Sequence, residues 1–162
     1  MKLSQTITKA INTQIKNEFD NAFLYLSIAS WCEENNLSGF AKWNLAQFKE
    51  EQEHAMKFYN YVFERHGKVE ITEVEKPKQN WNNIVDVFED VVKKEEETTE
   101  NIYKLYEIAK NENDYTTLSF LQWFLEEQVE EESTANAILS KIKMAANSSS
   151  ALMCLDAEVG KR

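Results

Sequence analysis

Apolar residues recur along this chain in alternating steps of three and four, the spacing of one face of an α-helix. Four long segments carry such a stripe, over about residues 4–35, 38–67, 81–111 and 114–146. Only 3 Gly and 1 Pro are present, which favours long helices over a fold with many turns. The pattern therefore predicts an all-α protein built mainly from four long helices.

The connections between these segments predict how the helices are arranged. Short polar turns follow the first and third segments, so each of these helices should run antiparallel to the next. Residues 68–80 form the only long connection, where Pro77 blocks a helix and an extended segment fits. Such a linker can return the chain to the end of the bundle where it started. We expect a four-helix bundle with one long crossover between the second and third helices.

The ends of the helices have recognisable residues. Ser4 or Thr6 can cap the first helix and Asp114 the fourth, and Gly67 is in the usual place for a glycine after the second helix. After the break at residues 147–150, residues 151–159 predict a short fifth helix. We expect one domain over residues 1–162, with the main bundle at about residues 4–146.

Polar residues interrupt every stripe near the middle of its helix. The inward positions that should be apolar but are not, together with the histidine beside them, are Glu18, Glu51, His54, Glu95, Gln128 and Glu131. The midpoints of bundled helices of similar length lie at one level whichever way each helix runs. These side chains should therefore meet in one layer inside the bundle.

A layer of buried carboxylates needs positive charge. An unpaired buried carboxylate costs several kcal/mol, on the order of 3 or more, and neighbouring acids repel each other as well. No Lys or Arg occupies a stripe position at this level. Metal ions would supply the charge; the alternatives are a solvated polar cleft or a set of protonated acids.

The ligand types favour a site for two ions of Fe, Mn or Zn, since carboxylates and an imidazole suit these metals. Glu51-x-x-His54 places a carboxylate and an imidazole one turn apart, and Glu51 is the expected bridge between the ions. A symmetric site would repeat Glu-x-x-His, but Gln128-x-x-Glu131 stands there instead. We therefore expect a tighter position beside His54 and a weaker, nearly all-carboxylate position beyond it.

Other polar groups lie close to this layer in the sequence. Tyr25 is two turns after Glu18, where it could hydrogen-bond a ligand, donate an electron, or simply be a core tyrosine. Glu50, Glu127 and Glu130 each precede an inward ligand, which allows a third ion site, an exit path, or a solvated face.

Composition narrows the classes of partner. The formal net charge is −10, which disfavours nucleic acid and anionic membrane surfaces as partners. Two cysteines, Cys32 and Cys154, do not make a disulfide framework and fit a reducing, cytoplasmic setting. The sequence starting at Met1 has no apolar segment typical of a signal peptide or a membrane span.

The chain resembles the non-haem, bacterial-type ferritins over nearly its whole length. The resemblance rests on Glu18 with Tyr25, on residues 49–54 (KEEQEH), on Glu95 and on residues 120–132 (FLQWFLEEQVEEE), together with the long crossover and the short fifth helix. Val129 stands where many members have His, and residues 151–155 (ALMCL) are less typical.

The resemblance implies iron storage in a shell of 24 subunits, with a ferroxidase centre in each bundle. It implies that two iron ions are bound by Glu18, Glu51, His54, Glu95, Gln128 and Glu131, near Tyr25. It also implies a third iron site at Glu50, Glu127, Glu130 and Glu131. Fe(II) and oxygen or hydrogen peroxide would be the substrates, and Fe(III) mineral the product. A haem-binding member is disfavoured, because that group resembles the symmetric pattern.

Two other functions remain open at this stage. A rubrerythrin-like di-iron oxidase or peroxidase would turn over without storing iron, although the altered second motif and the lack of a Cys-x-x-Cys segment disfavour it. A helical bundle that binds divalent ions only for structure would hold its metal tightly and consume no oxygen.

Overall fold

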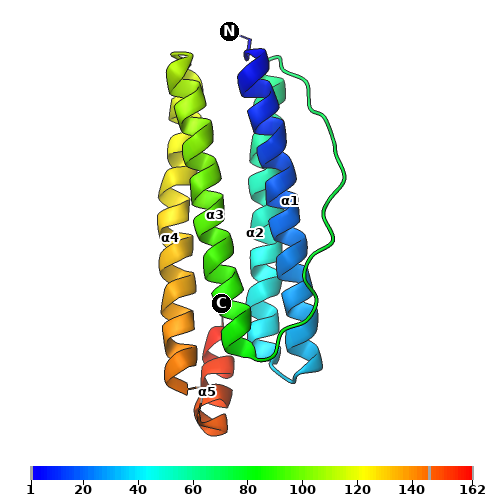
Figure 1. The fold of residues 1–162 in the computed structure, drawn as a ribbon, viewed down its shortest axis with the longest axis vertical. Coiled ribbons are helices and arrows are strands. Elements are labelled where there is room, and N and C mark those ends of the chain that lie inside the picture. Colours follow the sequence, from blue (N-terminus) through cyan, green and yellow to red (C-terminus); the bar gives the residue numbers. More distant parts are fainter. Residues whose placement is uncertain (1, 146, 162) are drawn as a thin grey trace.

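The computed structural model describes residues 2–145 and 147–161, and these residues form five helices without a strand. The helices are α1 (Gln5–Glu34), α2 (Ser38–Glu64), α3 (Ile84–Asn111), α4 (Tyr115–Ala145) and α5 (Ser149–Val159). Figure 1 shows α1 to α4 side by side as a long bundle, with α5 at the end opposite the start of α1. The predicted all-α bundle with one crossover and a short fifth helix is confirmed.

Most predicted helix boundaries agree within a few residues with those observed. Ser4 caps α1 by accepting a hydrogen bond from the Ile7 amide at 3.1 Å, and Asp114 caps α4 by accepting from the Thr117 amide at 3.0 Å. The third helix begins at Ile84 rather than near Trp81, because Asn83 caps it through the Asp86 amide at 3.0 Å. The predicted limits Met1, Ala146 and Arg162 lie outside the described residues.

The prediction for the end of α2 was wrong in one detail. The residue with left-handed backbone is His66 (φ 53°), and Gly67 follows it and donates its amide to the Val62 carbonyl at 2.8 Å. A Cβ at Gly67 would lie 2.8 Å from Val62 Cγ1, so glycine is needed there for close approach rather than for its φ angle. Asn36 and Asn113 have left-handed backbone after α1 and α3.

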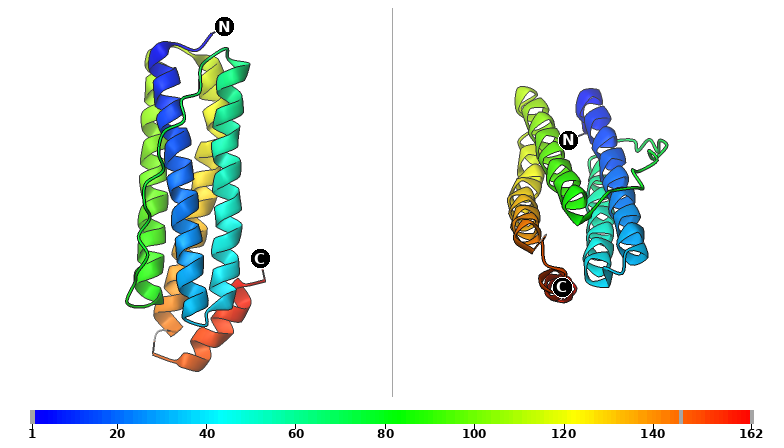
Figure 2. Two further views of the ribbon diagram at one scale, coloured as in Figure 1. Left: turned by 90° about the vertical axis from the view of Figure 1, so that its right-hand side faces the viewer. Right: turned by 60° about the horizontal axis from the view of Figure 1, so that its bottom comes forward.

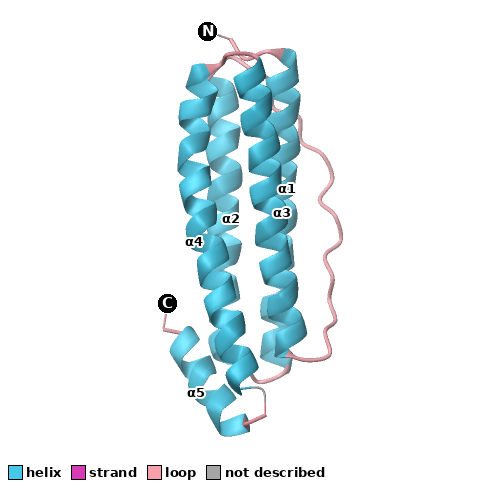
Figure 3. Cartoon of the chain, turned by 60° about the vertical axis from the view of Figure 1, so that its left-hand side comes forward, coloured by secondary structure: helices cyan, strands magenta, loops and turns pink. Residues whose placement is uncertain are grey.

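The crossover between α2 and α3 lies along the outside of α1 for much of the length of the bundle (Figures 1 and 3). Side chains of α1 hold it at several levels: Asn12 bonds the backbone of Lys68 and Glu70, and Asp20 accepts from the Glu75 amide at 2.8 Å. Further along, Ser27 donates to the Lys78 carbonyl at 2.6 Å. The crossover is therefore held against α1 by hydrogen bonds at several points along its length.

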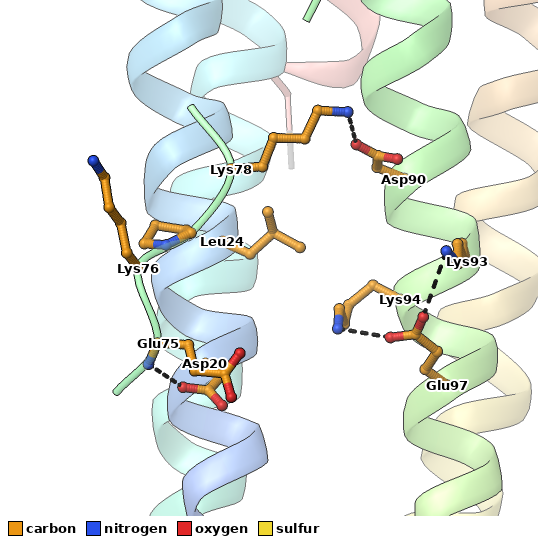
Figure 4. Close-up of a pocket in the computed structure, with 10 residues that line it drawn as sticks. Asp20, Leu24, Glu75, Lys76, Lys78, Asp90, Lys93, Lys94 and Glu97 are labelled. Carbon is orange, nitrogen blue, oxygen red and sulfur yellow. Dashed lines mark hydrogen bonds and ion pairs between the residues drawn. The ribbon is translucent and has the colours of Figure 1, made fainter. Parts of the chain in front are cut away.

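A surface pocket of about 270 Å³ lies between the crossover, α1 and α3, and its charges pair with one another (Figure 4). Lys78 bonds Asp90 at 2.6 Å, and Lys94 bonds Glu97 at 2.8 Å. Asp20, on the α1 side, is bonded to Lys16 at 2.5 Å. Because acids and bases neutralise each other here, this pocket lacks the unbalanced charge that a metal or an anion would require.

Helix α5 is fixed to the start of α2 by one side chain. The Asp156 carboxylate accepts hydrogen bonds from the amides of Gly39 and Phe40 at 3.0 and 2.9 Å, and so caps a helix that has no side-chain cap of its own. A Cβ at Gly39 would come within 1.7 Å of the Asp156 carbonyl oxygen. This close approach of α5 to α2, seen from below in Figure 2, requires glycine at position 39.

Two apolar clusters fill the bundle and leave a polar layer between them. One is nearer the start of α1 and includes Ile11, Ile15 and Phe58. The other is nearer α5 and includes Ile28, Phe40 and Phe88. Because apolar side chains close the bundle on both sides, the intervening layer is shielded from water along the bundle axis.

A second buried polar group lies where α2 ends and α4 begins. The Arg65 guanidinium is bonded to both Asp114 carboxylate oxygens, at 2.8 and 3.2 Å, and donates to Thr117 Oγ1 at 3.3 Å and to the Tyr61 hydroxyl. Arg65 is 8% exposed. Burial alone would raise the pKa of Asp114, but its hydrogen bond from Arg65 keeps that pKa below its ordinary value.

Candidate metal centre

The polar layer gathers Glu18 from α1 with Glu51 and His54 from α2. One ligand atom from each of the three side chains lies within 4.8 Å of the others, close enough for one ion to contact all three. His54 Nδ1 is 3.6 Å from Glu51 Oε2. All three residues are buried, and within the described part of the chain they form the only such group of acids, cysteines and histidines.

This group has acceptor oxygens that the protein does not satisfy. Among the described residues, no donor reaches Glu18 Oε2 or Glu51 Oε2, although both atoms are buried. The other Glu18 oxygen accepts from Gln14 Nε2 at 2.8 Å. Buried carboxylate oxygens normally have a donor or a cation, so these two atoms indicate the place where a cation fits.

The ionisation of these acids reflects the lack of positive charge. Burial raises the pKa of Glu18 well above its ordinary value, and the charge of Glu51 raises it further. Burial likewise raises the pKa of Glu51, with a further contribution from the charge of Glu95. Each acid therefore resists ionisation when the others are charged, and a bound cation would reverse this effect.

Glu95 and Glu131 belong to the same layer but are satisfied by neutral donors. Glu95 accepts from the Tyr25 hydroxyl and from Gln128 Nε2, the latter at 3.2 Å. Glu131 accepts from Gln47 Nε2 at 2.8 Å. Burial raises the pKa of Glu95, while the bonds from Tyr25 and Gln128 lower it in part. This half of the layer is therefore less dependent on a cation than the half that holds His54.

Tyr25 is a fully enclosed side chain, 1% exposed, whose hydroxyl bonds Glu95. The structure combines two of the three roles considered from the sequence, since Tyr25 is a core side chain and its hydroxyl bonds a candidate ligand, while electron donation stays a prediction. Burial raises the pKa of Tyr25 well above its ordinary value, and the charges of Glu95 and Glu51 raise it further. The phenol is therefore held in its protonated, donating form.

The acids predicted for a third ion site are more open to solvent. Glu50 and Glu127 are half-buried and Glu130 is exposed. The structure does not bring these side chains into the compact group formed by Glu18, Glu51 and His54. The third site therefore stays a prediction.

Several residues around the layer were not singled out from the sequence. Gln14 and Gln47 bond candidate ligands, and Asn21 bonds Thr98 Oγ1 at 3.0 Å in the same buried zone. Gln14 precedes Glu18, the residue that it bonds, by four residues on the same helix, so this spacing was a readable signal. The rings of Trp123 and Phe124 enclose His54, with centroids 5.5 and 6.1 Å away.

Comparisons with known proteins agree with this arrangement. Residues 8–145 match the ferritin family, described as a Ferritin-like domain. The chain is 38% identical over 160 residues to the bacterial non-heme ferritin of Staphylococcus aureus (strain USA300), covering 99% of this chain and 96% of that protein. It is 42% identical over 142 residues to the bacterial non-heme ferritin of Campylobacter jejuni, covering 88% and 85%.

Among solved structures, an open pore ferritin from the archaeon Archaeoglobus fulgidus superposes with a TM-score of 0.98 at 40% sequence identity. The superposition covers 99% of each chain. The crossover and the fifth helix are thus included in the likeness.

Proposed function

The chain belongs to the ferritin family, whose function is iron storage, and we propose that it oxidises Fe(II) in its central carboxylate layer before storing the product. The observation that supports this most strongly is the pair of unsatisfied buried oxygens on Glu18 and Glu51, beside His54. They provide negative charge and lone pairs at a point where the protein supplies no donor, which is the requirement of a site for a transient cation.

The first Fe(II) would bind to Glu18, Glu51 and His54. The second would bind to Glu51, Glu95 and Glu131, with Gln128 beside it and Glu51 as the bridge. Because this second position has carboxylates but no imidazole, we expect it to be the weaker one. A weak second position suits release of product rather than retention of a fixed cofactor.

The chemistry balances with iron as the electron donor. Two Fe(II) ions each lose one electron, and dioxygen gains both electrons with two protons to give hydrogen peroxide. Hydrogen peroxide can replace dioxygen as the acceptor, in which case the O–O bond breaks and water forms. The protein contributes by holding both ions within one apolar-walled layer, where the carboxylates stabilise the higher charge of Fe(III).

We further propose that Glu50, Glu127, Glu130 and Glu131 form a third iron site, and that Fe(III) mineral grows inside a shell of 24 subunits. Membership of the family supports both statements.

Residues 1–162 are proposed as one ferritin-like domain. No helix of the described residues is long and apolar enough to cross a membrane; a cytoplasmic location is part of the same proposal.

The deciding experiment measures the iron retained per chain after aerobic Fe(II) loading and desalting. We expect far more than the two or three ions that the sites themselves can hold. Retention of about two ions with oxygen consumed would instead indicate a discrete di-iron oxidase, and no oxygen consumption would leave a bundle that binds ions only for structure.

Variants test the assignment of residues. His54→Ala and Glu51→Ala should slow the fast phase of Fe(II) oxidation about 100-fold, which is the usual scale for losing a stabilising group at a reacting centre. The matched control is Glu53→Ala, which removes an exposed glutamate from the same helix. Unchanged kinetics in both site variants, with the shell still assembled, would refute the site.

A further inference from the structure

A groove of about 350 Å³ lies between α3 and α4. Its lining is partly polar (Thr99, Gln128, Glu132 and Ser133) and partly apolar (Leu125 and Val129). Among the described residues that line it, Glu132 is the only charged one, so its negative charge has no basic neighbour within the groove. This separates the groove from the crossover pocket, whose acids are paired with lysines.

Hydrogen bonds join this groove directly to the central layer. Thr99 Oγ1 donates to Glu132 Oε1, and Gln128 Nε2 lies 3.3 Å from Thr99 Oγ1. The same Gln128 nitrogen donates to Glu95 Oε2 at 3.2 Å. Polar contacts therefore run without a break from a half-buried carboxylate at the surface to a fully buried one inside.

The Gln128 side chain lies between the groove and the central layer. It lines the groove, yet it is 4% exposed and contacts Glu95. The terminal torsion of a glutamine side chain is broad, so its amide can turn to present oxygen instead of nitrogen. After that turn the Gln128 oxygen would face a cation, and the bond that now occupies Glu95 Oε2 would be released.

We propose that the α3–α4 groove is an entry path for divalent cations, in which Glu132 and Thr99 form a transient capture site and Gln128 passes the ion to Glu95. This inference rests on the proposed function, since it takes Glu95 as a ligand of the iron centre. It adds Glu132 and Thr99 as residues that act before the centre is filled.

The polar groups of the groove fit a divalent cation. Carboxylate, hydroxyl and amide oxygens are ligands for divalent ions such as Fe(II). A single carboxylate with few neighbours binds weakly, and weak binding allows onward movement. An unpaired negative charge in a concave site also raises the local concentration of cations.

Binding kinetics of Co(II) test the path without any oxidation step. Its visible absorption reports entry into the Glu51–His54 centre, because it changes with the ligands around the ion. We expect Glu132→Gln to slow the appearance of this absorption about five-fold or more, with its final amplitude unchanged. Ser133→Trp, which places an indole in the groove from an exposed position, should slow it as well.

The control is Glu100→Gln, which removes the same charge from an exposed position on α3 outside the groove. It should bind Co(II) at the wild-type rate, and sedimentation should show that all variants assemble alike. If Glu132→Gln kept the wild-type rate, or if Glu100→Gln slowed binding equally, the path would be refuted. A smaller final amplitude in Glu132→Gln would also refute it, by making Glu132 part of the centre.

The proposed metal centre, which this path assumes, is tested separately by the Co(II) spectrum at equilibrium. His54→Ala should remove most of the Co(II) absorption at equilibrium. If wild type and His54→Ala gave the same spectrum, the centre itself would be wrong, and the path with it. A normal centre with unchanged entry rates would overturn the path alone.

Discussion

The bundle contains two buried polar groups, and they differ in whether the protein itself supplies the positive charge that balances their carboxylates. At the end of α2, the Arg65 guanidinium neutralises Asp114, and the hydroxyls of Tyr61 and Thr117 take part in the same network. In the central layer, four glutamates have one imidazole and several neutral amides as partners, and two carboxylate oxygens have no donor among the described residues. The chain thus completes one polar group with its own ion pair, and under the proposed function a cation from solution completes the central layer.

The largest expected effect comes from removing the ion pair between Arg65 and Asp114. Arg65→Met should lower the free energy of unfolding by about 2–3 kcal/mol, because it leaves the half-buried Asp114 carboxylate without its charged partner and with the Thr117 amide as a donor. Chemical denaturation at a fixed subunit concentration would measure this. Lys78→Met, which breaks the more exposed pair with Asp90, should cost about 1 kcal/mol or less. Equal losses in the two variants would contradict the comparison.

Neutralising Glu51 in the central layer should raise the free energy of unfolding instead of lowering it. The folded-state pKa of Glu51 is raised, by burial first and then by the charge of Glu95. Stability from such a group is complete below the ordinary glutamate pKa and is lost as the pH rises through the raised one. Glu51→Gln should therefore stabilise the metal-free protein at about pH 7 by roughly 1 kcal/mol or more, since one pKa unit corresponds to about 1.4 kcal/mol.

The pH dependence supplies the control for that variant. The difference between Glu51→Gln and wild type should narrow as the pH falls below the ordinary glutamate pKa of about 4.3, because the wild-type carboxyl then becomes protonated in both states. Glu53→Gln, an exposed change on the same helix, should leave the unfolding midpoint unaltered. A destabilised Glu51→Gln at neutral pH would mean that the metal-free layer is already satisfied.

The last comparison separates two buried tyrosines, Tyr25 and Tyr61. Tyr25→Phe removes the hydroxyl that donates to Glu95, so the pKa of Glu95 should rise further and the weaker cation position should lose affinity. We expect about a ten-fold loss for the second equivalent of Zn(II) in calorimetry, since a hydrogen bond to a charged group is worth about 1.5 kcal/mol or more. Tyr61→Phe should leave Zn(II) binding unchanged, because its hydroxyl belongs to the Arg65 group.

Much of this architecture was readable from the sequence because helical stripes and turn residues are local signals. The four long helices, the crossover and the central level of Glu18, Glu51 and Glu95 follow from spacing alone. The roles of Gln47 and Thr99 could not be read, because each bonds a residue on another helix whose rotation the spacing does not fix. The anchoring of α5 by Asp156 was hidden for the same reason: its partners are the amides of residues 39 and 40.

The division of the central layer between two helical hairpins has a consequence for how the chain folds. Glu18, Glu51 and His54 all belong to α1 and α2, whereas Glu95, Gln128 and Glu131 belong to α3 and α4. Contacts within each hairpin are closer in sequence than contacts between the hairpins, so we expect each hairpin to form before the two dock. The acids of the two hairpins would then meet only in that late step, where their repulsion would slow docking. We expect Zn(II) to accelerate the late refolding phase of wild type and to leave that of Glu51→Ala unchanged, so that a divalent cation bound in this layer would also speed folding.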